Sequence, residues 1–86
     1  MGGVYIMSLT KNQFQFIINS DVEEMVHFLH EEQNIPLFEA FDIVYNSRIY
    51  EKLTNAKTGL YLQSADYIYS FLCEELSQKE KKTLSN

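Results

Sequence analysis

Two histidines and several carboxylates lie close together in the first third of the chain. His27 and His30 are three residues apart, so they would be neighbours on a helix, and Glu23 precedes His27 by one turn. Imidazole and carboxylate are ligands that zinc and iron accept. The HExxH motif is absent, and Glu-x-x-His occurs once, at Glu24, whereas di-iron bundles carry it on two helices. We therefore prefer a solvated acidic face, and keep a metal site of His27, His30 and Glu23 as the alternative.

The potential nucleophiles have structural explanations. Cys73 lies on an apolar helical stripe, where a thiol packs rather than reacts. Ser47 and Ser64 each precede a helical segment and are expected to cap it. No histidine follows these serines in the chain, and Gly59 stands alone rather than in a phosphate-binding loop. We expect no enzymatic activity, no catalytic residue and no cofactor.

Tyrosine is concentrated between residues 45 and 69, which hold five of the six tyrosines. Three of these fit apolar helical stripes and are expected to pack within the domain: Tyr45, Tyr50 and Tyr69. The other two fit less well, and tyrosine and arginine often dominate the binding energy of interfaces. The sequence therefore predicts an interaction patch of four residues: Arg48, Gly59, Tyr61 and Tyr67.

Length and composition indicate one small globular domain. A chain of 86 residues with 45% hydrophobic residues folds around a thin core, so a protein partner or a homodimer is expected to complete its burial. The single cysteine excludes an internal disulfide, and no apolar run reaches the roughly 18 residues that span a bilayer. We expect no membrane association and a cytoplasmic location.

Charge is distributed unevenly around the net value of −5. Residues 1–44 hold seven acids and one base, whereas residues 45–86 hold five acids and six bases. The basic residues cluster only at the end of the chain, around Lys79, Lys81 and Lys82. Phosphate binding needs a larger basic surface, so we expect no nucleic-acid partner.

Helical periodicity and capping signals place the elements that carry these residues. A first helix is predicted from about residue 10 to 33, where Thr10 with Gln13 matches a capping box. A second box, Ser20 with Glu23, leaves open one kinked helix or two collinear helices. A second helix should start with Pro36 at its first position and break near residue 46.

A short third helix is expected after Ser47, followed by a turn at residues 54–59. The apolar triplet 60–62 favours a helical connection over an edge strand, because it has no partner strand. A last helix starts after Ser64. Together these elements predict an all-α fold, a small antiparallel bundle of three to four helices. The predicted domain covers residues 10–78, between a flexible extension (1–9) and a flexible basic tail (79–86).

Residues 14–76 resemble a family of short bacterial helical proteins of unknown function. The resemblance rests on the succession FLHEEQNIPLFEAFDIVYNSRIYEKLT, a polar turn and SADYIYSFLCEEL, with Tyr50 followed by Leu53 and a closing helix from Ser64. After Leu53, where we would look for a histidine, this chain has Thr54. Members of that family are often encoded beside ADP-ribosyltransferase-like proteins, so the resemblance implies a companion or antitoxin role.

Two functions follow as expectations. The first is a non-enzymatic protein-protein interaction module, antitoxin-like or a companion protein, that uses the acidic first helix and the tyrosine patch. The second is a metal- or small-ligand-binding bundle that uses His27, His30 and neighbouring glutamates.

Overall fold

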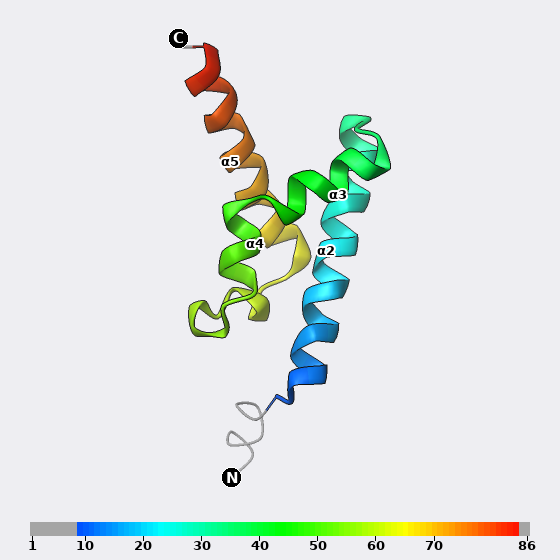
Figure 1. Cartoon of the computed structure of the whole chain (residues 1–86), viewed down its shortest axis with the longest axis vertical. Coiled ribbons are helices and arrows are strands. Elements are labelled where there is room, and N and C mark those ends of the chain that lie inside the picture. Colours follow the sequence, from blue (N-terminus) through cyan, green and yellow to red (C-terminus); the bar gives the residue numbers. More distant parts are fainter. Residues whose placement is uncertain (1–8, 85–86) are drawn as a thin grey trace.

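A computed structural model describes the chain from residue 9 to residue 84, with side chains to residue 79. It contains four α-helices and two short 3₁₀ turns: α2 (Lys11–Gln33), α3 (Leu37–Tyr45), α4 (Arg48–Leu53), η1 (Ala56–Thr58), η2 (Leu60–Leu62) and α5 (Ala65–Leu84). No strand occurs in this part of the chain, and the predicted all-α bundle is confirmed. In Figure 1 the chain rises in α2, descends through α3 and α4, and rises again in α5.

The first helix is continuous. Its start has the predicted capping box: the Gln13 amide donates to Thr10 Oγ1 (3.0 Å) and the Thr10 amide donates to Gln13 Oε1 (2.9 Å). The second box does not interrupt the helix, because one buried stripe runs through it: Ile18, Val22, Met25, Val26 and Leu29. The helix ends where Asn34 adopts left-handed angles (φ 57°).

The descending leg is divided into two helices at Asn46 and Ser47, as predicted. Ser47 is buried, and its hydroxyl accepts from the Tyr50 amide (3.0 Å) and donates to the Val44 carbonyl (2.6 Å). The start of this leg differs from the prediction by one residue. Pro36 is extended (ψ 146°) and precedes α3, which begins at Leu37.

The α4–α5 connection is made of short helical turns. Gly59 separates η1 from η2 with a φ of 70°, a value that glycine adopts without strain. The triplet 60–62 is a 3₁₀ turn, so it is not an edge strand. The Tyr67 amide donates to Ser64 Oγ (3.2 Å), which confirms Ser64 as the cap of α5.

Helix α5 continues to Leu84, so the predicted boundary between domain and tail at residue 78 lies inside a helix. The predicted extension (1–9) lies outside the described residues except for Leu9, as do the last two residues.

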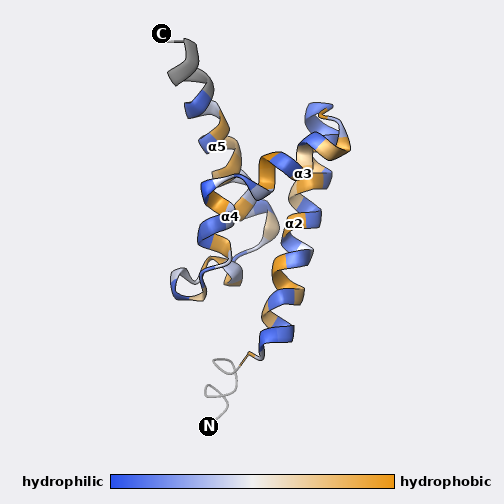
Figure 2. Cartoon of the chain, in the orientation of Figure 1, coloured by the Kyte–Doolittle hydropathy of each residue, from blue (hydrophilic) through white to orange (hydrophobic). Residues whose placement is uncertain are grey.

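The core is apolar and lies between α2, the α3–α4 leg and α5. Its fully buried members come from all four helices, and Figure 2 shows hydrophobic residues in orange recurring along these helices. Several partly buried aromatic side chains pack against it: Phe14, Phe41, Tyr50, Tyr61, Tyr69 and Phe71. Among the described helices, none is both long enough and apolar enough to cross a bilayer.

Candidate functional site

The four residues of the predicted patch do not form one surface. Tyr61 is half-buried, and its ring packs edge-on against Phe14 of α2, with centroids 5.0 Å apart and planes at 77°. This contact packs η2 against α2. Gly59 holds the left-handed turn just before it. Both residues therefore have structural roles in joining the α4–α5 connection to the first helix.

The other two residues of the patch border a common surface between α4 and α5. Tyr67 is half exposed and packs its ring edge-on against Phe71 (centroids 4.9 Å apart). Phe71 in turn lines a shallow groove of about 190 Å³ together with Arg48 and Lys52. Arg48 and Tyr67 are thus placed near one another, through Phe71.

The histidines lie on the exposed face of α2. His27 lines a shallow hollow with Glu23 and Glu24, whereas His30 Nδ1 lies 2.8 Å from the Ile35 carbonyl at the α2–α3 turn. Within residues 9–79, no three histidine, cysteine or acidic side chains are grouped closely enough to hold a metal ion. The metal alternative therefore has two neighbouring histidines and no assembled ligand set to support it.

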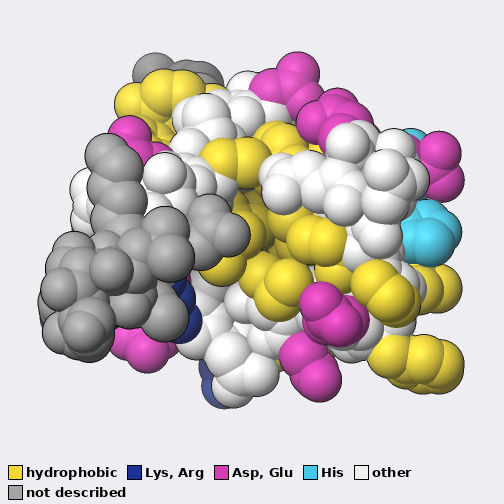
Figure 3. All heavy atoms as spheres, turned by 90° about the horizontal axis from the view of Figure 1, so that it is seen from above, with side chains coloured by type: hydrophobic (Ala, Val, Ile, Leu, Met, Phe, Trp, Pro, Cys, Tyr) yellow, Lys and Arg dark blue, Asp and Glu magenta, His cyan; other side chains and the backbone are white. Residues whose placement is uncertain are grey.

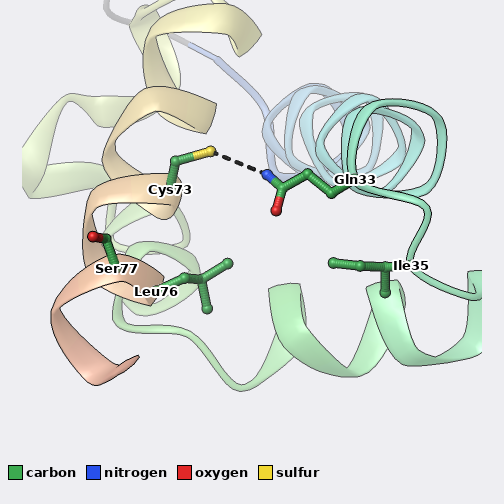
Figure 4. Close-up of a pocket in the computed structure, with 5 residues that line it drawn as sticks. All are labelled: Gln33, Ile35, Cys73, Leu76 and Ser77. Atoms are coloured by element: carbon green, nitrogen blue, oxygen red, sulfur yellow. Dashed lines mark hydrogen bonds between the residues drawn. The ribbon is translucent and has the colours of Figure 1, made fainter. Parts of the chain in front are cut away.

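Another groove lies where the end of α2 and the turn after it face α5. It has a volume of about 350 Å³ and five lining residues, shown in Figure 4: Gln33, Ile35, Cys73, Leu76 and Ser77. The side-chain amide of Gln33 donates to Tyr69 Oη (2.8 Å) and lies 3.7 Å from Cys73 Sγ. These two contacts join residues that are 36 and 40 positions apart in the chain.

Tyr69 takes part in this contact from the first turns of α5. Its ring packs on Phe28 of α2, with centroids 4.9 Å apart. Burial, then the hydrogen bond to Cys73, raises the pKa of Tyr69 to about 12, while the Gln33 hydrogen bond lowers it. The hydroxyl therefore stays protonated and acts as a fixed polar link between α2 and α5.

Two large apolar side chains lie exposed at the start of α3, two and three residues after the groove residue Ile35. Phe38 is 88% exposed and Leu37 is 48% exposed. Both fit the apolar helical spacing of this segment, yet neither is covered by another helix. The stripe that α3 buries against α2 is carried by Ala40 and Val44 instead.

Acidic side chains surround this end of the molecule. Figure 3, which views it from above, shows an apolar hollow in the middle with carboxylates at several points of its border. Glu32 precedes the groove residue Gln33 and acts electrostatically on Tyr69, whereas Glu74 and Glu75 of α5 line the neighbouring α4–α5 groove. The end of the molecule thus combines exposed apolar surface with negative charge.

Asp21 of α2 is the one described acid with a large pKa shift. Its Oδ2 is buried and has no hydrogen-bond partner among the described residues. Burial, and then the charge of Glu24, raises the pKa of Asp21 from 3.8 to about 6. The folded state thus binds this proton more tightly than the unfolded state, and stability falls as pH rises from about 4 to 6.

Asp21→Asn is therefore expected to stabilise the protein at pH 7 by roughly 1 kcal/mol, after allowance for solvent screening of a half-exposed carboxylate. The advantage should disappear at pH 3.5, where Asp21 is protonated in both states. Urea denaturation of both proteins at each pH measures it. Glu23→Gln, on the exposed face, is the matched control and should change little. An equal advantage at both pH values would contradict the assignment.

Comparisons with protein-family models, with curated proteins and with solved structures found no match.

Proposed function

We propose that this chain is a non-enzymatic protein-protein interaction module that binds another protein chain in the cytoplasm, as an antitoxin-like or companion protein. The observation that carries the proposal is Phe38, which is 88% exposed beside Leu37 at the start of α3, three residues after the groove residue Ile35. Burying such a ring is worth about 1.5–3 kcal/mol, so a partner that covers it gains substantially.

Three features support a binding role. The exposed pair leaves the fold intact, because α3 is held to α2 by other residues. The groove adds apolar surface contributed by the α2–α3 turn and by α5. The resemblance to short proteins encoded beside ADP-ribosyltransferase-like proteins favours a dedicated companion. A second copy of the chain is the other partner that the thin core favours.

The test is to co-express the chain with each product of its adjacent genes and to measure complexes by native mass spectrometry. We expect a stoichiometric complex whose affinity falls about 30-fold for Phe38→Ser, since central aromatic anchors contribute about 2 kcal/mol or more. The variant should keep the helical circular dichroism of the parent, because the ring is exposed.

Leu62→Ser is the matched control. Leu62 is 63% exposed and lies in η2, away from the α2–α3 corner, so its replacement should leave the affinity unchanged. Recovery of the protein as a monomer at high dilution, with no complex from any adjacent gene product, would overturn the proposal. So would equal losses for Phe38→Ser and Leu62→Ser.

A further inference from the structure

We infer that the groove between the end of α2, the α2–α3 turn and α5 binds an amphipathic helix of the partner, with one large apolar anchor side chain flanked by lysine or arginine. This inference rests on the proposed function and specifies the chemistry of its partner. It follows from the shape of the groove, its lining and the charge around it.

The lining accepts an apolar anchor. Ile35 and Leu76 face each other across the groove in Figure 4, and Cys73 lies above them on α5. A volume of about 350 Å³ is at the lower end of the 300–1,000 Å³ of typical ligand sites, which suits one or two side chains rather than a whole cofactor. The groove therefore matches a protein segment better than a large small-molecule ligand.

The walls of the groove are helices, which favours a helical occupant. One wall is the last turn of α2 and the residues after it, and the other is two turns of α5. Helix α5 leans away from α2 and α3 toward its end in Figure 1. The groove residues Gln33 and Ser77 are exposed, so the groove is open to solvent. An amphipathic helix that lays its apolar face into such a groove is a recurrent mode of peptide recognition.

The charge around the groove selects a basic segment. Four exposed acids lie on the last turn of α2 and on α3: Glu31, Glu32, Glu39 and Asp42. Residues 30–45, which include both stretches, contain no lysine or arginine. Glu74 and Glu75 of α5 line the neighbouring α4–α5 groove, so the carboxylates of α2 and α3 supply the attraction. Complementary charge raises association rates and excludes acidic competitors.

Gln33 adds a directional acceptor. Its side-chain nitrogen donates to Tyr69, and Figure 4 shows its oxygen turned toward the space between Ile35 and Leu76. An oxygen held in this way accepts a hydrogen bond from an ammonium or guanidinium group beside the anchor. The same residue thus links α2 to α5 and favours the predicted occupant.

The experiment uses the full chain and three labelled helical peptides of equal length in fluorescence anisotropy. One peptide alternates leucine and lysine at helical spacing, one replaces lysine by glutamate, and one replaces leucine by serine. We expect the leucine–lysine peptide to bind at least 30-fold more tightly than either control. Its affinity should fall as salt rises, because the charges are exposed to solvent.

Matched variants locate the binding. Ser77→Phe places a ring in the groove from an exposed position and should weaken binding at least tenfold, whereas Gln78→Phe places it in the neighbouring α4–α5 groove and should not. Glu31→Lys with Glu32→Lys should abolish binding. Glu23→Lys with Glu24→Lys makes the same change in net charge farther along α2 and should weaken it only slightly.

Three outcomes would overturn the inference. One is an affinity for the peptide that Ser77→Phe leaves unchanged. Another is an equal loss of affinity for the two charge reversals, which would indicate nonspecific attraction. The third is a homodimer that Ser77→Phe dissociates, since the occupant would then be a second copy. A native complex that is weakened by Phe38→Ser but not by Ser77→Phe would support the proposed function and contradict this inference.

Discussion

Leu72→Ala is expected to destabilise the protein by about 3 kcal/mol, the largest single effect among the variants considered. Leu72 is completely buried in the core, on the face of α5 that packs against α2 and α4. Truncation loses buried apolar surface and leaves a cavity that three rigid helices cannot close. A domain of this size has a stability of roughly 5–10 kcal/mol, so the loss is a large fraction of the total.

Urea denaturation monitored by circular dichroism at 222 nm measures this effect. The midpoint should fall while the slope of the transition stays constant, because the surface exposed on unfolding is nearly unchanged. Leu62→Ala is the matched control: Leu62 is 63% exposed, so its truncation should cost less than about 0.5 kcal/mol. A loss below 1 kcal/mol for Leu72→Ala would contradict the packing of α5.

Glu75→Ala is expected to destabilise the protein by about 2 kcal/mol through the backbone of another helix. The Glu75 carboxylate accepts from the amides of Arg48 (2.9 Å) and Ile49 (3.2 Å), the first two residues of α4. These amides have no partner within a helix of six residues, and Ser47 already accepts from the third. Hydrogen bonds to a charged acceptor are stronger than neutral ones.

Glu75→Gln should cost about half as much, since a neutral amide oxygen still accepts a hydrogen bond. The matched control is Glu74→Ala. Glu74 is an exposed acid at the preceding position of α5, and its replacement should change stability by less than about 0.5 kcal/mol. Hydrogen exchange offers a second readout: the Arg48 and Ile49 amides should exchange faster in Glu75→Ala than in the parent. Unchanged exchange at both amides would contradict the role of the Glu75 carboxylate as the cap of α4.

Stability and binding are separable in this molecule. The side chains that we propose for binding, Phe38 and Ser77, are exposed, whereas the side chains that hold the fold, Leu72 and the Glu75 cap, are buried or engaged. Variants of the first kind should change affinity without changing the denaturation midpoint. This separation allows each proposal to fail independently of the fold.

Local signals in the sequence predicted most of the elements. The Thr10–Gln13 box, the Ser47 cap, the Ser64 cap and the Gly59 turn all occur where the sequence indicated. Each depends on a backbone angle or on a hydrogen bond between residues that are close together in the chain. The local sequence is therefore enough to predict it. The triplet 60–62 was ambiguous because three residues are too few to show a period.

The candidate site could be predicted only in part. Tyr61 was assigned to a partner surface, but it packs on Phe14, 47 positions away in the chain. Phe38 fits the apolar helical spacing of α3, yet it is exposed. Periodicity identifies an apolar face; it does not show whether another helix covers every residue of that face.

The sequence by itself determined that the chain forms helices, where most of them begin and end, and that its first half is acidic, because these properties depend on residues close together in the chain. Only the tertiary structure decided that Glu75 caps α4, that Gln33 meets Tyr69 and Cys73, and that Phe38 lies uncovered. Those contacts join residues 26 to 40 positions apart, and their formation depends on how the packed helices are oriented.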